Sequence, residues 1–147
     1  MRVSEVRTHD VQVVSPADTI QKAAACMDDL NVGALPVCDG ERLQGVITDR
    51  DITVRATAAG HSPSQCKVGD IMTEEIDYVF EDDEVEDAAE KMKARQIRRL
   101  PVVNREKKLV GVLSLGDLAT KGAGESSATL EKVSSPSRPD RGRKKKG

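Results

Sequence analysis

Apolar residues follow two alternating spacings along the chain, and the same succession of spacings occurs twice. Short apolar stretches over residues 11–14 and 76–80 are typical of strands. Each is followed by an apolar stripe with the spacing i, i+3, i+4, i+7, which predicts an amphipathic helix with one buried face. The stripes consist of Ile20, Ala23, Ala24 and Met27 in the first half and of Val85, Ala88, Ala89 and Met92 in the second.

Each half continues with two more strand-like runs and a second helix. The runs cover residues 35–38 and 43–47, then 100–103 and 109–113. Asp39-Gly40 between the first two runs indicates a hairpin. Helices are predicted over 49–59, closed by Gly60, and over 115–121, closed by Gly122. The order β-α-β-β-α combines a hairpin with a crossover, so the predicted fold class is α+β.

The first helix of each half carries a predicted start signal. Asp18 and Asp83 are expected to be the N-cap residues. Gln21 and Glu86 stand three residues later, which completes the pattern of a capping box.

The two halves form a repeat with a period of about 65 residues. The matching segments are Val3–Thr8 with Val68–Thr73, Leu35-Pro36-Val37 with Leu100-Pro101-Val102, and Leu43–Thr48 with Leu109–Ser114. One residue is inserted between Pro101 and Gly111. Residues 1–62 and 63–122 are therefore expected to be tandem repeats that pack with pseudo-twofold symmetry. Because each repeat has few large side chains, we expect them to share one core.

Charge separates the repeats from the end of the chain. Residues 121–147 contain eight basic and three acidic residues, a net charge of +5, whereas the whole chain of 147 residues carries −2. Residues 123–147 are rich in Gly, Ser, Pro and charge and are predicted to be a disordered basic tail. Nucleic-acid binding is expected at most through this tail, since the remainder is acidic and Tyr78 and Phe80 are its only aromatic residues.

Composition also limits the expected cellular location of the protein and the kinds of chemistry it can carry out. No apolar run reaches the roughly 20 residues of a membrane span, and the N-terminus has no apolar signal region, so a cytoplasmic location is expected. Cys26, Cys38 and Cys66 form no C-x-x-C pair and are interpreted as buried structural thiols. No catalytic constellation and no metal-ligand spacing occurs, so neither an enzyme nor a metal site is predicted.

The sequence Gly-x-x-Thr-x-x-Asp at Gly45, Thr48 and Asp51 allows two interpretations. In the first, Thr48 caps the following helix and Asp51 reaches back to the Thr48 amide. In the second, the helix start and the Thr48 hydroxyl hold a phosphate, and Asp51 accepts both hydroxyls of a ribose. The pattern recurs with Ser114 and Asp117. This recurrence favours the nucleoside-phosphate interpretation.

The tandem pattern of strand, helix, Leu-Pro-Val, hairpin and Gly-x-x-[Thr/Ser]-x-x-Asp resembles a CBS domain pair, or Bateman module, over roughly residues 3–121. It is similar to short stand-alone bacterial members of that family. The resemblance implies a sensor of AMP, ADP, ATP, NAD or S-adenosylmethionine, with ligand clefts between the repeats. It also implies a homodimer in the form of a flat four-repeat disc, and no required cofactor.

Carried over to this sequence, the resemblance assigns Thr48 and Asp51 to one cleft and Ser114 and Asp117 to the other. Basic residues before Leu-Pro-Val reach ligand phosphates in the family, and here only the second copy has them, as Arg98 and Arg99. We therefore expect two unequal sites, with the phosphate-rich one at Thr48 and Asp51. The predicted adenine contacts are Val13 and Pro36 in one site and Tyr78 and Pro101 in the other.

The leading prediction is thus a regulatory module that senses an adenosyl ligand and signals to a separate, unknown effector protein. A constitutive interaction scaffold without ligand sensing is the first alternative. Polyanion binding through the basic tail is the second.

Overall fold

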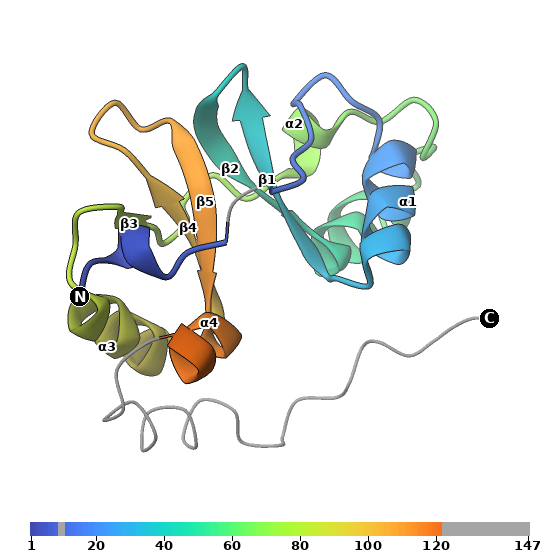
Figure 1. The fold of residues 1–147 in the computed structure, drawn as a ribbon. Helices are drawn as coiled ribbons and strands as arrows, with labels where there is room; N and C mark the ends of the chain where they lie inside the picture. Colours follow the sequence, from blue (N-terminus) through green and yellow to red (C-terminus); the bar gives the residue numbers. More distant parts are fainter. Residues whose placement is uncertain (9–10, 122–147) are drawn as a thin grey trace. The chain divides into compact units, whose positions relative to one another are not determined.

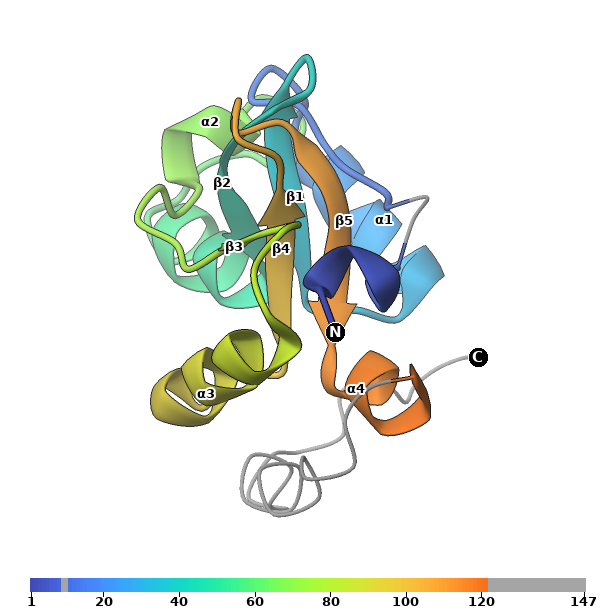
Figure 2. The ribbon, with the colours of Figure 1, turned by 60° about the vertical axis from the view of Figure 1, so that its left-hand side comes forward.

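The computed structural model describes residues 1–8 and 11–121, which form two compact units (Figures 1 and 2). Of the described residues, the first unit contains those of Met1–Val11 together with Asp77–Lys121, and the second contains Gln12–Ile76. The units are thus divided at different places from the sequence repeats 1–62 and 63–122. The predicted tail, 123–147, and the closing residue Gly122 lie outside the described residues.

The second unit contains α1 (Ile20–Leu30), β1 (Ala34–Asp39), β2 (Arg42–Thr48), the π-helix η2 (Asp51–Thr57) and α2 (Val68–Ile71). Strands β1 and β2 pair antiparallel, and Gly40 takes a left-handed φ of 64° in the tight turn between them. Single bridges add Val14 beside Val37, in parallel, and Thr73 beside Val46, antiparallel. The predicted helix over 49–59 is thus realised largely as a π-helix.

The first unit contains η1 (Val3–Glu5), β3 (Val79–Phe80), α3 (Val85–Arg95), β4 (Arg99–Val103), β5 (Leu109–Ser114) and α4 (Leu115–Lys121). Its sheet has the order β3-β4-β5, with β3 parallel and β5 antiparallel to β4. Thr8 bridges to Val112, as Thr73 does to Val46 in the other unit. The mixture of hairpins, crossovers and helices confirms the α+β class.

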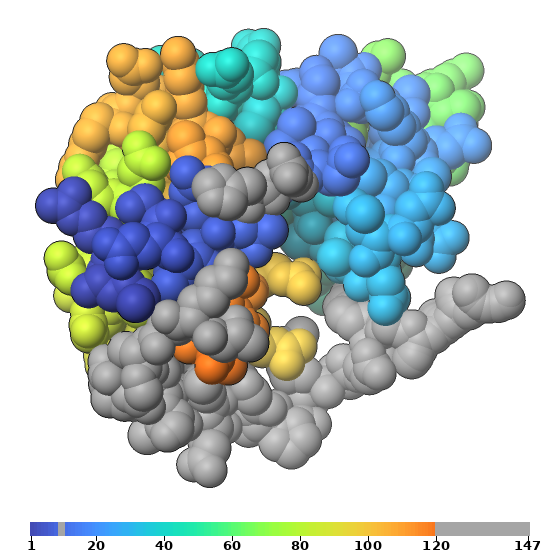
Figure 3. Space-filling model, viewed as in Figure 1, coloured from blue at the N-terminus to red at the C-terminus, as the bar shows by residue number. Residues whose placement is uncertain are grey.

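Each unit is completed by a segment from the beginning of the other sequence repeat. Within residues 3–8, the amides of Val3 and Ser4 donate to the carbonyl oxygens of Asp83 and Glu81, and Thr8 bridges to Val112 of β5. Figures 1 and 2 show this segment in dark blue, and Figure 3 shows its atoms on the surface of this unit. Residues 68–73 join their unit in the same way: the amides of Val68 and Gly69 donate to the carbonyl oxygens of Asp18 and Pro16, and Thr73 bridges to Val46 of β2. The segments match one another in sequence, which explains why they take equivalent places.

The buried apolar side chains form two clusters, one for each unit, instead of the single shared core predicted from the sequence. Val3 and Val6 belong to one cluster, and Val68 and Ile71 to the other. Each of these segments thereby adds two buried apolar side chains to the core of its unit, and burial of apolar area favours the folded state.

The helix stripes are confirmed except at one position. All four predicted residues of α3 are buried, as are Ile20, Ala23 and Met27 of α1, whereas Ala24 is exposed. Position 24 stands at the margin of the stripe, where a small side chain gains little from burial.

The predicted caps Asp18 and Asp83 are wrong. The helices begin one residue later, at N-caps Thr19 and Glu84, and only the Thr19 side chain accepts a bond, from the Lys22 amide. Asp18 and Asp83 instead accept hydrogen bonds from the amides of Ser15 and Phe80, at 2.8 and 2.9 Å. These carboxylates fold the turn before each helix, because a short acidic side chain can bond nearby backbone in place of capping.

Candidate functional site

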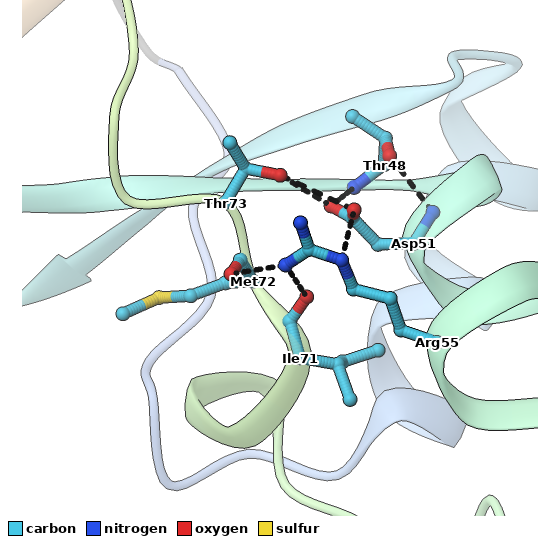
Figure 4. A network of polar contacts seen from close by, with 6 residues as sticks. All are labelled: Thr48, Asp51, Arg55, Ile71, Met72 and Thr73. Carbon is cyan, nitrogen blue, oxygen red and sulfur yellow. Dashed lines mark hydrogen bonds and ion pairs between the residues drawn. The ribbon is translucent and has the colours of Figure 1, made fainter. Parts of the chain in front are cut away.

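Thr48 and Asp51 meet where β2 gives way to η2 (Figure 4). The Thr48 amide donates to Asp51 Oδ2 at 3.0 Å, and the Asp51 amide donates to Thr48 Oγ1 at 3.0 Å. This reciprocal pair is the predicted capping box. It fixes the two candidate ligand-binding side chains beside one another.

Ser114 and Asp117 repeat this arrangement at the start of α4. The Ser114 amide donates to Asp117 Oδ2, and the Asp117 amide to Ser114 Oγ, both at 3.1 Å. The motif therefore produces the same local geometry in both units, despite the exchange of Thr for Ser.

A threonine from the segments 3–8 and 68–73 also reaches each aspartate. Thr73 Oγ1 lies 3.2 Å from both carboxylate oxygens of Asp51. Thr8 Oγ1 lies 3.3 and 3.1 Å from the two carboxylate oxygens of Asp117. The sequence analysis did not predict either threonine as a site residue. The signal that could have identified them was their equivalent position in the two matching segments, Val3–Thr8 and Val68–Thr73.

Arg55 adds a cation to the site of the second unit. Its Nε lies 3.7 Å from Asp51 Oδ1, and its Nη1 donates to the carbonyl oxygens of Ile71 and Met72 at 3.2 and 3.1 Å (Figure 4). The arginine therefore connects the carboxylate to the end of α2. Its spacing of four residues from Asp51 places it one turn further along the helix.

The motif glycines allow the close approach of the protein's own chain. A Cβ at Gly45 would lie 2.4 Å from the Thr73 carbonyl oxygen, and one at Gly111 would lie 2.5 Å from that of Thr8. Two backbone hydrogen bonds join Thr73 to Val46, at 2.8 and 2.9 Å. The glycine thus seats the threonine that contacts the aspartate.

The other predicted residues are distributed over both units. Arg98 and Arg99 are exposed at the start of β4, and Arg99 is paired in register with Ser114 of its own unit. Thr48 and Asp51 belong to the second unit, so the assignment of the arginines to their site stays a prediction. The register brings Arg99 close to Ser114, because opposite residues on antiparallel strands are neighbours.

The residues expected to contact adenine differ in exposure. In the second unit, Pro36 is buried and Val13 is 38% exposed. In the first unit, Pro101 and Tyr78 are half-buried. The Tyr78 ring meets Phe80 edge to face with a centroid distance of 5.8 Å, and the Lys107 ammonium lies 5.4 Å from its centre. Their contact with a base stays a prediction.

The thiols lie apart from this chemistry. Cys38 and Cys66 are buried, whereas Cys26 is half-buried and so departs from the predicted burial. Burial raises the pKa of the Cys38 thiol to about 11, which disfavours its reactive thiolate. Within residues 1–8 and 11–121 no three His, Cys, Asp or Glu side chains are grouped as a metal site would require. In the same residues, no helix has the length and apolar character of a membrane span.

Comparison with known proteins places the repeats in a family. The model of the CBS domain matches residues 3–56 and again 68–124. A CBS domain-containing protein, YhcV of Bacillus subtilis, is 43% identical over 126 residues, which cover 86% of this chain and 89% of that protein.

Two solved structures extend the comparison to the fold. Hypoxic Response Protein I, solved with two coordinated zinc ions, is 32% identical with a TM-score of 0.73, over 82% of this chain and 98% of that one. CBSX2 in complex with AMP is 29% identical with a TM-score of 0.69, over 80% of this chain and 93% of that one. The chain belongs to the CBS domain family and carries two tandem CBS repeats.

Proposed function

We propose that this protein is a non-catalytic regulatory module that binds an adenosyl ligand at Thr48 and Asp51 and at Ser114 and Asp117. The ligand class comprises AMP, ADP, ATP, NAD and S-adenosylmethionine. The observation that carries the proposal is the recurrence of one hydroxyl–carboxylate geometry in both units. The solved complex of CBSX2 with AMP supports the choice of ligand.

The chemistry of the motif suits a nucleoside phosphate. Thr48 Oγ1 is the acceptor of the Asp51 amide bond, so its own O–H proton can donate to a phosphate oxygen. Asp51 is an ionisable acceptor with room for several bonds, and charge-assisted bonds to two ribose hydroxyls are strong. Arg98 and Arg99 are proposed to favour phosphate at the Thr48–Asp51 site.

Regulation requires that the ligand bind two arrangements of the protein with different affinity. We propose that a homodimer, a disc of four repeats, is the assembly whose arrangement the ligand alters. A separate effector protein would respond to this change of arrangement. We propose that both proteins are located in the cytoplasm.

The experiment is a titration of the full chain by isothermal calorimetry with each of the five ligands, beside Asp51→Ala and Asp117→Ala. We expect saturable binding of at least one ligand, and loss of one binding event in each variant. The absence of binding by all five ligands at millimolar concentration would refute the proposal.

A constitutive scaffold is the second candidate, and one observation favours it. Asp51 already accepts hydrogen bonds from the Thr48 amide and the Thr73 hydroxyl, and Asp117 from the Ser114 amide and the Thr8 hydroxyl, so each carboxylate has partners within the protein. A scaffold's unfolding temperature would not respond to the ligands. A ligand at a hundredfold excess over its Kd would stabilise a sensor by about 2.7 kcal/mol.

A further inference from the structure

We propose that Thr73 is a positioning residue for Asp51, and that Thr8 has the same role for Asp117. Each hydroxyl holds its carboxylate in the orientation that accepts both hydroxyls of a ribose. This inference rests on the proposed function and deepens it, because it names residues outside the motif that determine the preference for an intact ribose.

The orientation of the Asp51 carboxylate is fixed from two directions. The Thr48 amide bonds Oδ2 from the end of β2, and the Thr73 hydroxyl lies 3.2 Å from both oxygens on the segment after α2. The Asp51 side chain is only 9% exposed, so little solvent competes for these contacts. Two donors on separate segments restrict rotation of the carboxylate about its last bond.

Thr73 is itself held by the backbone. Its amide donates to the Val46 carbonyl at 2.8 Å, and its carbonyl accepts from the Val46 amide at 2.9 Å. The close contact at Gly45 leaves no room for any larger residue on β2 at this point. The hydroxyl is therefore presented to Asp51 by a rigid segment.

The first unit repeats every part of this arrangement. The Thr8 amide donates to the Val112 carbonyl at 2.8 Å, the Val112 amide donates to the Thr8 carbonyl at 3.2 Å, and Gly111 gives the close approach. The Thr8 hydroxyl then meets Asp117. The same triad of glycine, threonine and aspartate in two separate cores indicates a common purpose.

The bonding capacity of the carboxylate leaves room for the ligand. Its two oxygens accept about four hydrogen bonds. The Thr48 amide and the Thr73 hydroxyl supply two donors, and Arg55 lies beyond hydrogen-bond distance at 3.7 Å. The remaining capacity matches two adjacent ribose hydroxyls. Without the Thr73 donor, the carboxylate would rotate and lose this match.

The test compares AMP with 2′,3′-dideoxy-AMP, which lacks both hydroxyls, on the full chain carrying Asp117→Ala so that one site is observed. Thr73→Val preserves the shape and removes the donor. We expect it to raise the Kd of AMP about tenfold, which corresponds to about 1.4 kcal/mol, and to leave the Kd of dideoxy-AMP within twofold of its value in the parent protein. Thr73→Ser restores the hydroxyl and should restore AMP affinity.

Thr57→Val is the matched control, because it makes the same exchange at an exposed position of η2. It should bind AMP as its parent does. Thr8→Val in an Asp51→Ala background makes the test again in the first unit, so the inference remains testable if Thr73→Val does not fold.

Three results would overturn the inference: unchanged AMP affinity in both valine variants, an equal loss for AMP and dideoxy-AMP, or a serine variant as weak as valine. If the parent proteins bind no ligand, the proposed function fails as well. Binding by the parents with any of the three results refutes the positioning role alone.

Discussion

The two units use one network in two environments. In both, an amide, a hydroxyl and a close backbone bridge surround an aspartate, but Asp51 is buried whereas Asp117 is half-buried. Asp51 also has Arg55 one helical turn away. Sequence equivalence therefore fixes which atoms bond, and the surroundings fix how much solvent competes with those bonds.

This difference has energetic consequences. A hydrogen bond to a charged group contributes about 1.5–3 kcal/mol, and leaving a buried donor unpaired is costly. A substitution that removes a hydrogen bond to Asp51 should therefore lower the free energy of unfolding more than the equivalent substitution at Asp117. A substitution that disturbs only the backbone bridge should lower it by a similar amount in both units.

The largest effect is expected at the motif glycines. Gly45→Ala and Gly111→Ala would each place a Cβ within 2.5 Å of a threonine carbonyl oxygen. Because that oxygen belongs to a bridged backbone, we expect each change to destabilise its unit by about 3 kcal/mol. Chemical denaturation monitored by circular dichroism measures this. A tolerated alanine in one unit only would break the equivalence of the two bridges.

Replacing each aspartate should destabilise the two units to different extents. Asp51→Ala leaves the Thr48 amide and the Thr73 hydroxyl without their acceptor in a buried place, and we expect a loss of about 2–3 kcal/mol. Asp117→Ala should cost about 1 kcal/mol, because water can replace its carboxylate. Urea unfolding of each variant without ligand provides the comparison. Equal losses would show that burial does not distinguish the sites.

Arg99→Ala tests which of the two sites uses this arginine to bind the ligand phosphates. If Arg99 serves the Thr48–Asp51 site, ATP should bind about tenfold more weakly there, or about 1.4 kcal/mol. Adenosine, which has no phosphate, should be unaffected. Calorimetry in Asp117→Ala and Asp51→Ala backgrounds assigns the effect to a site. A loss confined to the Ser114–Asp117 site would assign the arginine to its register neighbour.

The smallest effect concerns the turn before α1. The hydrogen bond from the Ser15 amide, aided by Lys22, lowers the pKa of Asp18 below its ordinary 3.8 despite some desolvation. A lowered pKa in the folded state stabilises the fold above pH 3.8 and ceases to do so as the pH falls through the folded value. Asp18→Asn should therefore destabilise the protein slightly at pH 7 and less at pH 2.5. Thermal unfolding at the two pH values measures it, with Asp29→Asn, at an exposed aspartate, as control.

The sequence predicted the repeated elements because their signals are local. The hairpin at Asp39-Gly40, the stripes of α1 and α3, and the capping box at Thr48 and Asp51 each depend on residues within a few positions of one another. The caps at Asp18 and Asp83 failed for a related reason, since an acidic residue before a helix can bond the turn behind it as well as the helix ahead.

The pairing of segments could not be predicted in this way. The sequence displayed Thr8 and Thr73 as equivalent, but it gave no sign that each lies against the aspartate of the unit it joins. That choice depends on contacts across 109 and 22 residues of chain. Local spacing carries no information on such distances.

By itself, the sequence determined the α+β repeat, the two capping boxes and the family, because periodicity and short motifs reflect near neighbours. Only the tertiary structure decided that the segments 3–8 and 68–73 complete two separate cores and deliver a threonine to each aspartate. The physical reason is that burial of apolar side chains and pairing of backbone polar groups stabilise contacts between segments that fit together, however far apart they stand in the sequence.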